Sequence, residues 1–213
     1  RFPAMQDAHS DRLGRSRGDP ELEPEASWNS DLSYIYRINE KLQIRTALYF
    51  SRLRQTIQEV YGVDPENSAV YQFQNTGDAR FYGWELDAGW KPIGVLETGL
   101  QYTLTRRENL TRPELYFTDV PVHRVYGFAE VKPFRRLRFR VSGMYNSERI
   151  STSDGSFQAD PFFRMDTGFS LTILKALMLT GSVDNLWDAA YSYVEGYPSP
   201  GRELYLGLRY MIR

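Results

Sequence analysis

The sequence contains no cysteine and only two histidines, His9 and His123. Without cysteine, disulfide frameworks and cysteine-based zinc sites are excluded. The HExxH zinc signature, the glycine-rich phosphate loops and the GxSxG elbow are also absent from the chain. Its many carboxylates include no pair whose spacing is specific for acid/base catalysis. We therefore expect no catalytic residue, no metal site, no cofactor and no enzymatic activity.

The chain also lacks an excess of charge of either sign. Its 213 residues include 26 Lys and Arg against 27 Asp and Glu, which gives a formal net charge of −1. This balance disfavours a nucleic-acid binder held by phosphate neutralisation. No apolar run reaches the roughly 18–20 residues of a membrane-spanning helix. The mean hydropathy of −0.51 fits a soluble protein, but a membrane barrel alternates lipid-facing and water-facing residues and also averages out polar.

Aromatic residues, by contrast, are abundant, since 15% of the chain is Phe, Trp or Tyr. Such an excess fits the interfacial girdles of a membrane barrel, and a tyrosine-rich soluble sandwich is the alternative. From Ala26 onward the dominant period is two, which indicates strands. About nine segments alternate in this way; the first carries Trp28, Leu32, Tyr34, Tyr36 and Ile38, and the last carries Leu204, Leu206, Leu208, Tyr210 and Ile212.

The expected connections between these segments alternate in length. Short turns are predicted at 39–41, 91–94, 133–136 and 174–176, and long polar connections near 61–69, 108–120, 150–160 and 188–200. Long loops on one rim and tight turns on the other are typical of an outer-membrane barrel. Nine strands would leave two open edges, and unpaired backbone groups are costly in lipid. We therefore expect this sequence to supply part of a larger barrel.

Three stretches resemble the C-terminal portion of TonB-dependent outer-membrane receptors. Residues 1–25 begin Arg-Phe-Pro and end Asp-Pro-Glu-Leu-Glu-Pro-Glu, similar to a family loop, with Asp19 where Asn is usual. The second stretch is NTGDARFYGWELDAGW, and the third is VDNLWDAAYSYVEGYPSPGRELYLGLRY. The matched positions are Asn75, Gly77, Ala79, Gly83 and Glu85 in the second, and Asn185, Leu186, Asp188, Tyr191, Gly196, Tyr197, Pro198, Pro200, Gly201 and Arg202 in the third.

The resemblance implies an all-β fold, an antiparallel up-and-down transmembrane β-barrel of 22 strands to which this chain contributes about nine. It implies an extracellular loop segment at residues 1–25 and the C-terminal part of the barrel at residues 26–213. The implied location is the outer membrane of a Gram-negative cell. The implied function is import of a ferric siderophore, cobalamin or a similar large ligand with energy supplied through TonB.

The resemblance also implies three partners: outer-membrane lipid or lipopolysaccharide, TonB through an N-terminal region outside this sequence, and a metal-chelate or cobalamin-like ligand. No nucleic acid is expected. The matched motif positions are expected to have structural roles. The candidates for contact with the ligand are loop residues, namely His9, Arg12, Arg15, Arg17, Tyr193 and Tyr197.

Two other interpretations remain open from the residues. One is a self-contained small barrel that acts as a passive pore or anchor, which requires a tenth strand within residues 1–24, where Pro3, Pro20 and Pro24 argue against it. The other is a soluble β-rich binding module. Dependence on detergent would distinguish this module from both barrels, because a lipid-facing band cannot stay monodisperse in water.

Overall fold

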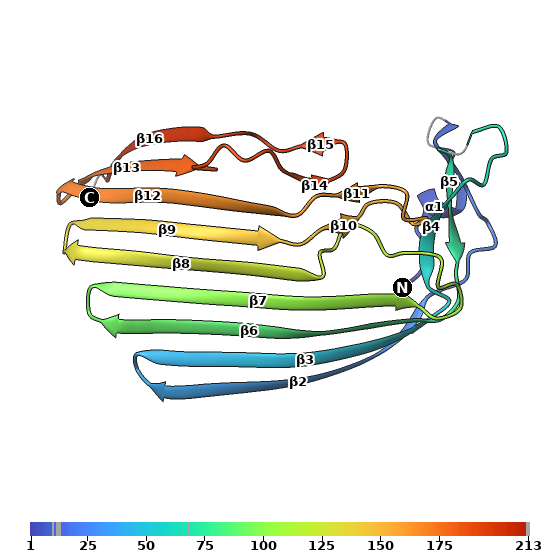
Figure 1. Cartoon of the computed structure of the whole chain (residues 1–213), viewed down its shortest axis with the longest axis horizontal. Coiled ribbons are helices and arrows are strands. Elements are labelled where there is room, and N and C mark those ends of the chain that lie inside the picture. Colours follow the sequence, from blue (N-terminus) through green and yellow to red (C-terminus); the bar gives the residue numbers. More distant parts are fainter. Residues whose placement is uncertain (10, 12–13, 68, 212–213) are drawn as a thin grey trace.

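Nine strands form one antiparallel sheet in the computed structural model, which describes residues 1–9, 11, 14–67 and 69–211 (Figure 1). The strand order is β16-β13-β12-β9-β8-β7-β6-β3-β2, so each strand pairs with its neighbours along the meander. The strands are β2 (Ala26–Asn39), β3 (Leu42–Arg54), β6 (Ala79–Ile93), β7 (Leu96–Asn109), β8 (His123–Phe134), β9 (Leu137–Asn146), β12 (Phe162–Leu174), β13 (Leu177–Asp184) and β16 (Glu203–Tyr210). The sheet confirms the predicted antiparallel fold and the count of about nine strands.

Smaller elements lie in the connections and outside the main sheet. The only helix among the described residues, α1 (Met5–His9), is far too short to cross a membrane. The small strands are β1 (Ser16–Arg17), β4 (Ile57–Tyr61) and β5 (Tyr71–Asn75), which form one sheet, together with the pairs β10 (Arg149–Ile150) with β11 (Gln158–Ala159) and β14 (Ser192–Val194) with β15 (Tyr197–Pro198). Because β1 pairs with β5, it does not supply the tenth strand that a self-contained small barrel requires.

The register places apolar side chains on one face of the sheet, which we call the outward face. One row across it runs Leu32, Leu48, Trp84 and Leu104 over β2, β3, β6 and β7. The first three of these side chains are exposed rather than packed in a core, and Leu104 is partly exposed; Leu32 is 72% accessible. A soluble protein rarely exposes so extensive an apolar surface, whereas a membrane barrel turns it toward lipid.

The opposite face, here called the lumenal face, is mainly polar. A row across it runs Gln101, Tyr126, Met144 and Arg164 over β7, β8, β9 and β12. Side chains alternate between the two faces because successive residues of a strand point to opposite sides. This alternation explains why the chain has a negative mean hydropathy although its outward face is apolar.

The two rims of the sheet differ as the sequence predicted. Tight turns join β2 to β3, β6 to β7, β8 to β9 and β12 to β13 at one rim, on the left in Figure 1. Long connections at 55–78, 110–122, 147–161 and 185–202 gather at the other rim. The three-stranded sheet and both small hairpins lie at that second rim, which we call the loop rim (Figure 1).

Candidate functional site

Arginine and aromatic side chains gather on the lumenal face near the loop rim. Alternation places Arg107 at the end of β7, Arg124 at the start of β8 and Arg164 near the start of β12 on this face. Phe81 of β6 and Phe162 of β12 have the same orientation. We call this group, together with the loop residues that contact it, the vestibule wall.

Arg107 lies beside two aromatic rings that contact each other. Phe81 and Phe117 meet edge to face with ring centroids 4.7 Å apart, and the Arg107 guanidinium lies 5.9 and 5.5 Å from their centroids. Its Nη2 donates a hydrogen bond of 2.7 Å to the Thr118 carbonyl. Cation–π attraction and this hydrogen bond orient the guanidinium, and they join the 110–122 connection to the sheet.

Arg164 anchors a second aromatic group. It donates to the Asp166 carboxylate at 2.8 Å and to the Tyr191 hydroxyl at 3.0 Å. Three aromatic rings contact one another beside it, with centroid separations from 4.8 to 5.7 Å; they belong to Phe162, Tyr191 and Tyr193. Phe162 is buried, whereas Tyr193 is 43% exposed, so the group presents an aromatic ring with a polar hydroxyl at the surface of the wall.

Arg149 of β10 is a buried side chain that forms hydrogen bonds to two of the long connections. It is only 3% exposed, and its guanidinium donates to the carbonyls of Ser147, Ser192 and Tyr193. It also lies 5.3 Å from the Phe162 ring centroid. A buried guanidinium requires such partners, because burying an unpaired charge is costly. Arg149 therefore connects the 147–161 connection to β14.

Two groups near the vestibule wall have shifted pKa values. Burial raises the pKa of Asp119 above its usual 3.8, although Ser151, Thr118, Arg149 and Arg107 favour its charged form. Burial, followed by the neighbouring Glu59 carboxylate, raises the pKa of Tyr61 to about 12. Tyr61 is therefore neutral at physiological pH. Among the described residues, the wall combines four arginines (107, 124, 149 and 164) with two aspartates that interact with them, Asp119 and Asp166, so positive charge exceeds negative charge there.

A separate charge network lies on the lumenal face nearer the tight turns. Lys91 and Lys132 both approach Glu97, with N–O distances of 3.6 Å. Lys132 also contacts Glu130 at 2.9 Å, and Arg140 lies 3.8 Å from the same carboxylate. The network spans β6 to β9, so this part of the lumenal face carries both positive and negative side chains.

The ligand candidates named from sequence are divided between two places. His9 ends α1, the Arg15 carbonyl accepts from Tyr71 N–H, and Arg17 forms an exposed ion pair with Asp64 at 2.8 Å. Arg12 lies outside the described residues. Tyr193 joins the aromatic group around Arg164, whereas Tyr197 is 74% exposed on β15. No contact between described residues joins the His9–Arg17 segment to either tyrosine, and the part that these six residues take in ligand binding stays a prediction.

Sequence reasoning missed the arginines of the vestibule wall. Arg107, Arg149 and Arg164 are distant in sequence and were not among the candidates. The available signal was the strand alternation itself, because it turns Arg107 and Arg164 to the same polar face as Glu85.

The motif residues of β5 and β6 fix the joint between the 55–78 connection and the sheet. The Asn75 side chain donates to the carbonyls of Glu23 and Gln55 at 3.0 and 2.8 Å and accepts from Glu23 N–H at 2.8 Å. Gly77 has a φ of 92°, and a Cβ there would collide with Thr111. Only glycine adopts this conformation without strain. Glu85 points to the lumenal face.

The motif residues after β13 form a tight corner. Asn185 is 2% exposed with a φ of 52°; its side chain exchanges two 2.9 Å hydrogen bonds with the Ala189 backbone. Leu186 N–H donates to the Met165 carbonyl at 2.7 Å. The Asp188 carboxylate accepts from Arg202 N–H at 2.7 Å, and a Cβ at Gly201 would lie 2.6 Å from the same oxygen. Asn adopts left-handed backbone conformations more readily than most residues, and its side chain can hydrogen-bond to the backbone of nearby residues. Both properties suit this position.

An exposed apolar face, a polar lumenal face and unequal rims define the wall of an outer-membrane β-barrel. A family model described as "TonB dependent receptor-like, beta-barrel" matches residues 1–186. The chain belongs to this family of receptors and transporters and contains part of its barrel domain, which lies in the outer membrane of Gram-negative cells. The nine-stranded sheet is an open portion of that barrel.

Individual relatives agree with this membership. An iron-regulated outer membrane virulence protein of Vibrio cholerae serotype O1 is 25% identical over 92% of this chain. The chain spans about a third (32%) of that relative's length. Copper transporter OprC superimposes with a TM-score of 0.83 at 18% identity, covering 99% of this chain and 36% of OprC. The ferric enterobactin receptor PfeA of Pseudomonas aeruginosa gives a TM-score of 0.72 at 17% identity, covering 92% of this chain and 32% of PfeA.

Proposed function

We propose that the protein containing this chain imports an anionic, aromatic metal chelate of the ferric siderophore type, with energy supplied through TonB. The observation that carries this proposal is the excess of guanidinium groups among aromatic rings on the vestibule wall. Guanidinium groups bind carboxylate and catecholate oxygens through charge-assisted hydrogen bonds, and aromatic rings pack against planar donors. The name of the Vibrio cholerae relative, which is iron-regulated, supports the same class of cargo.

Cobalamin is the alternative cargo, and it differs in charge and shape from an anionic catecholate. A wall selected for cobalamin would not need an excess of arginine. The vestibule wall therefore favours the siderophore, and the charge dependence of binding separates the two cargoes.

The test uses the complete receptor from outer membranes and a ferric catecholate siderophore. The changes Arg107→Gln, Arg124→Gln and Arg164→Gln are each expected to weaken binding by about tenfold or more, because a hydrogen bond to a charged group contributes about 1.5–3 kcal/mol. Isothermal titration measures the affinity. Uptake of radioactive iron by cells with and without TonB measures the energy coupling.

Arg45→Gln is the matched control. Arg45 faces the lumen from the middle of β3, opposite Asp87 and remote from the vestibule wall. Its loss removes the same charge and should change the affinity by less than about twofold. Equal affinities for all four variants, or cobalamin binding that shows the same dependence on the three arginines, would contradict the proposal.

A further inference from the structure

The lumenal face is hollowed over β12, β13 and β16, the last three strands of the sheet. Short side chains form the floor of this hollow, because two rows of cross-strand neighbours there consist mostly of Gly, Ser and Thr. One row runs Arg138, Ser170, Thr180 and Gly207, and the other runs Arg140, Gly168, Ser182 and Tyr205. The hollow has a volume of about 490 Å³, within the roughly 300–1,000 Å³ of small-molecule sites. We call it the lumenal hollow.

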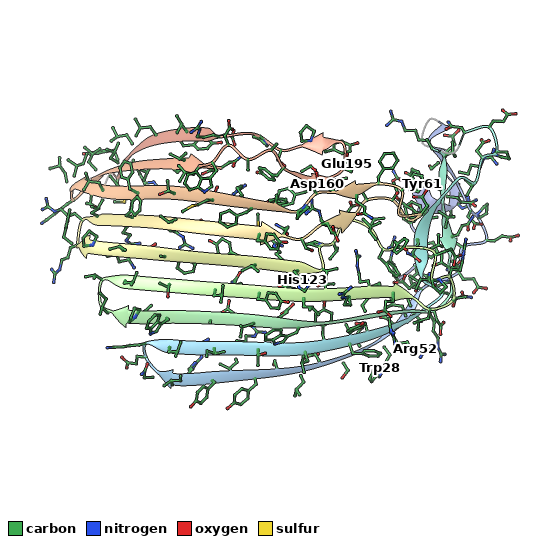
Figure 2. The ribbon with its side chains drawn as sticks, viewed as in Figure 1. Trp28, Arg52, Tyr61, His123, Asp160 and Glu195 are labelled. Atoms are coloured by element: carbon green, nitrogen blue, oxygen red, sulfur yellow. The ribbon has the colours of Figure 1, made fainter. Side chains whose placement is uncertain are left out.

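The lumenal hollow is separate from the vestibule wall. Ser170 lies six residues beyond Arg164 on β12, a distance of about 20 Å along the strand. It lies only four residues before the end of β12 at Leu174, so the hollow is nearer the tight turns. Figure 2 labels Asp160 and Glu195 toward the loop rim, at the other end of these strands.

Positive charge exceeds negative charge beside the hollow. Arg138 is exposed and forms no ion pair with any residue that the structure describes. Glu130 lies 3.8 Å from Arg140, but it binds Lys132 more closely, at 2.9 Å. Together with the rest of the charge network nearer the tight turns, four described cations surround two carboxylates, namely Lys91, Lys132, Arg138 and Arg140 against Glu97 and Glu130. An anion in the hollow would compensate this excess.

The two arginines face the lumen and not the membrane. Arg138 and Arg140 alternate along β9 with Leu137, Phe139 and Val141, which lie on the outward face. Lipid headgroups outside the sheet therefore cannot reach the two guanidinium groups. An anion that binds them must lie inside the barrel.

The walls and floor of the hollow suit a planar anion. The Arg140 guanidinium lies 3.8 Å from the Phe128 ring centroid, a contact that holds it in place. Tyr205 lines the opposite side and is 53% exposed, so its ring is available to a flat ligand. Ser170 and Ser182 line the floor, and their hydroxyls can donate hydrogen bonds to ligand oxygens.

We propose that the lumenal hollow is a second binding site for the anionic metal chelate, occupied after the chelate has left the vestibule wall and moves toward the tight-turn rim. Guanidinium groups bind the carboxylate or catecholate oxygens of such a ligand through charge-assisted hydrogen bonds. The inference rests on the proposed function, because it concerns the same cargo. It adds a site on other strands, about 20 Å from the vestibule wall, that acts during release.

The experiment measures how well the chelate protects a thiol on the floor of the hollow. The complete receptor carries Thr180→Cys, at a position where this chain has no cysteine of its own to compete. Cells with and without TonB are treated with a small thiol reagent while a ferric catecholate siderophore is supplied. Uptake should slow modification of the thiol at least about threefold, because the bound chelate covers the floor. Cells without TonB should show no protection, since the chelate then stays at the vestibule wall.

Two variants of the Thr180→Cys receptor test the chemistry of the hollow. R138Q/R140Q removes both guanidinium groups and should abolish the protection and slow iron uptake at least about fivefold. Ser182→Leu fills the floor without changing a charge and should also abolish the protection. The affinity of both variants for the siderophore at equilibrium should stay within about twofold, because the vestibule wall is intact.

The matched control is R37Q/R45Q, which removes two lumenal arginines from β2 and β3, outside the hollow. It should keep the full protection. Protection that survives R138Q/R140Q, or that is lost equally in the control, would overturn the inference. A thiol that is unreactive before siderophore is added would also overturn it, since another segment of the protein would then fill the hollow.

Siderophore affinity, measured on the same receptor, separates this inference from the proposed function. Binding at the vestibule wall together with protection of the thiol supports both. Binding without protection during uptake overturns only the inference. Absence of siderophore binding overturns the proposed function, and the inference with it.

Discussion

At the scale of single residues, glycine and aromatic side chains are paired across strands of the lumenal face. Gly83 of β6 lies opposite Tyr49 of β3, whose ring crosses the glycine so that its hydroxyl donates to Thr105 Oγ1 on β7 at 3.0 Å. Gly99 of β7 lies opposite Phe128 of β8 in the same way. A Cβ on either glycine would meet the ring above it. The absence of a side chain at these positions is therefore a packing requirement.

The change Gly83→Ala is expected to lower the free energy of unfolding by about 1–3 kcal/mol, the usual effect of overpacking. The added methyl would collide with the Tyr49 ring and the Leu104 carbonyl. Gly89→Ala is the matched control, because it lies on the same strand and face and its Cβ would meet nothing within 4 Å. Urea unfolding of the refolded receptor in detergent measures both changes. Equal stabilities would refute this explanation of Gly83.

Residue identities could be predicted from sequence where the backbone dictates them. Gly77 and Asn185, matched through the family resemblance, both have positive φ values. Arg107 and Arg164 could not be selected in this way. Arginine fits any polar strand position, so the sequence does not show which arginines converge with Phe117 or Tyr191 from separate loops.

At the scale of elements, the loop rim depends on contacts between connections that are distant in sequence. Asn109 of β7 donates to Gln58 Oε1 of β4 at 2.7 Å, which holds the β4–β5 hairpin against the sheet. Arg149 similarly joins β10 to β14 through backbone carbonyls. These buried polar contacts give the long connections defined positions.

Arg149→Met is expected to release β14 and the following corner while the main sheet persists. The change removes donors to three carbonyls, two of them on β14, and each such charged hydrogen bond contributes about 1.5–3 kcal/mol. Amide hydrogen exchange should accelerate at 192–194 and remain slow in β12 and β13. Arg136→Met, in an exposed tight turn at the other rim, is the control and should leave exchange at 192–194 unchanged. Unchanged protection at 192–194 in Arg149→Met would contradict the assigned role.

The nine long strands were predictable because each has one lipid-facing side and one polar side. The β4–β5 hairpin was not, and the sequence indicated a loop around 61–69. Its strands lack clean alternation because both faces are covered: Ile57 and Gln58, neighbours in the chain, are both buried. A period of two is visible only where the two sides of a strand meet different surroundings.

At the scale of the whole molecule, the sheet ends in two edge strands, β2 and β16, each paired with a neighbour on one side only. Within a bilayer such edges must be paired, because lipid offers no hydrogen bonds to the backbone. The apolar outward face requires the same environment. Leu206 of β16 is 80% exposed. The protein is therefore expected to need both further strands and detergent.

The intact mass of the native protein, captured from outer membranes with an antibody against this segment, tests the expectation of further strands. A mass of about three times 24.8 kDa is expected, because the chain covers 32% of its curated relatives. The same sample should aggregate when detergent is removed. A native mass of 24.8 kDa would favour a self-contained small barrel, and a monodisperse sample without detergent would favour a soluble module.

The meander has a consequence for the order of assembly. Every strand of the large sheet pairs with strands adjacent to it along the meander, so each pairing closes only a short loop and costs little chain entropy. Growth can then proceed one hairpin at a time. Closing the barrel requires pairing its first strand with its last strand, and this is the only pairing between strands at opposite ends of the barrel's sequence. We therefore expect closure to be the slow, rate-limiting step of insertion.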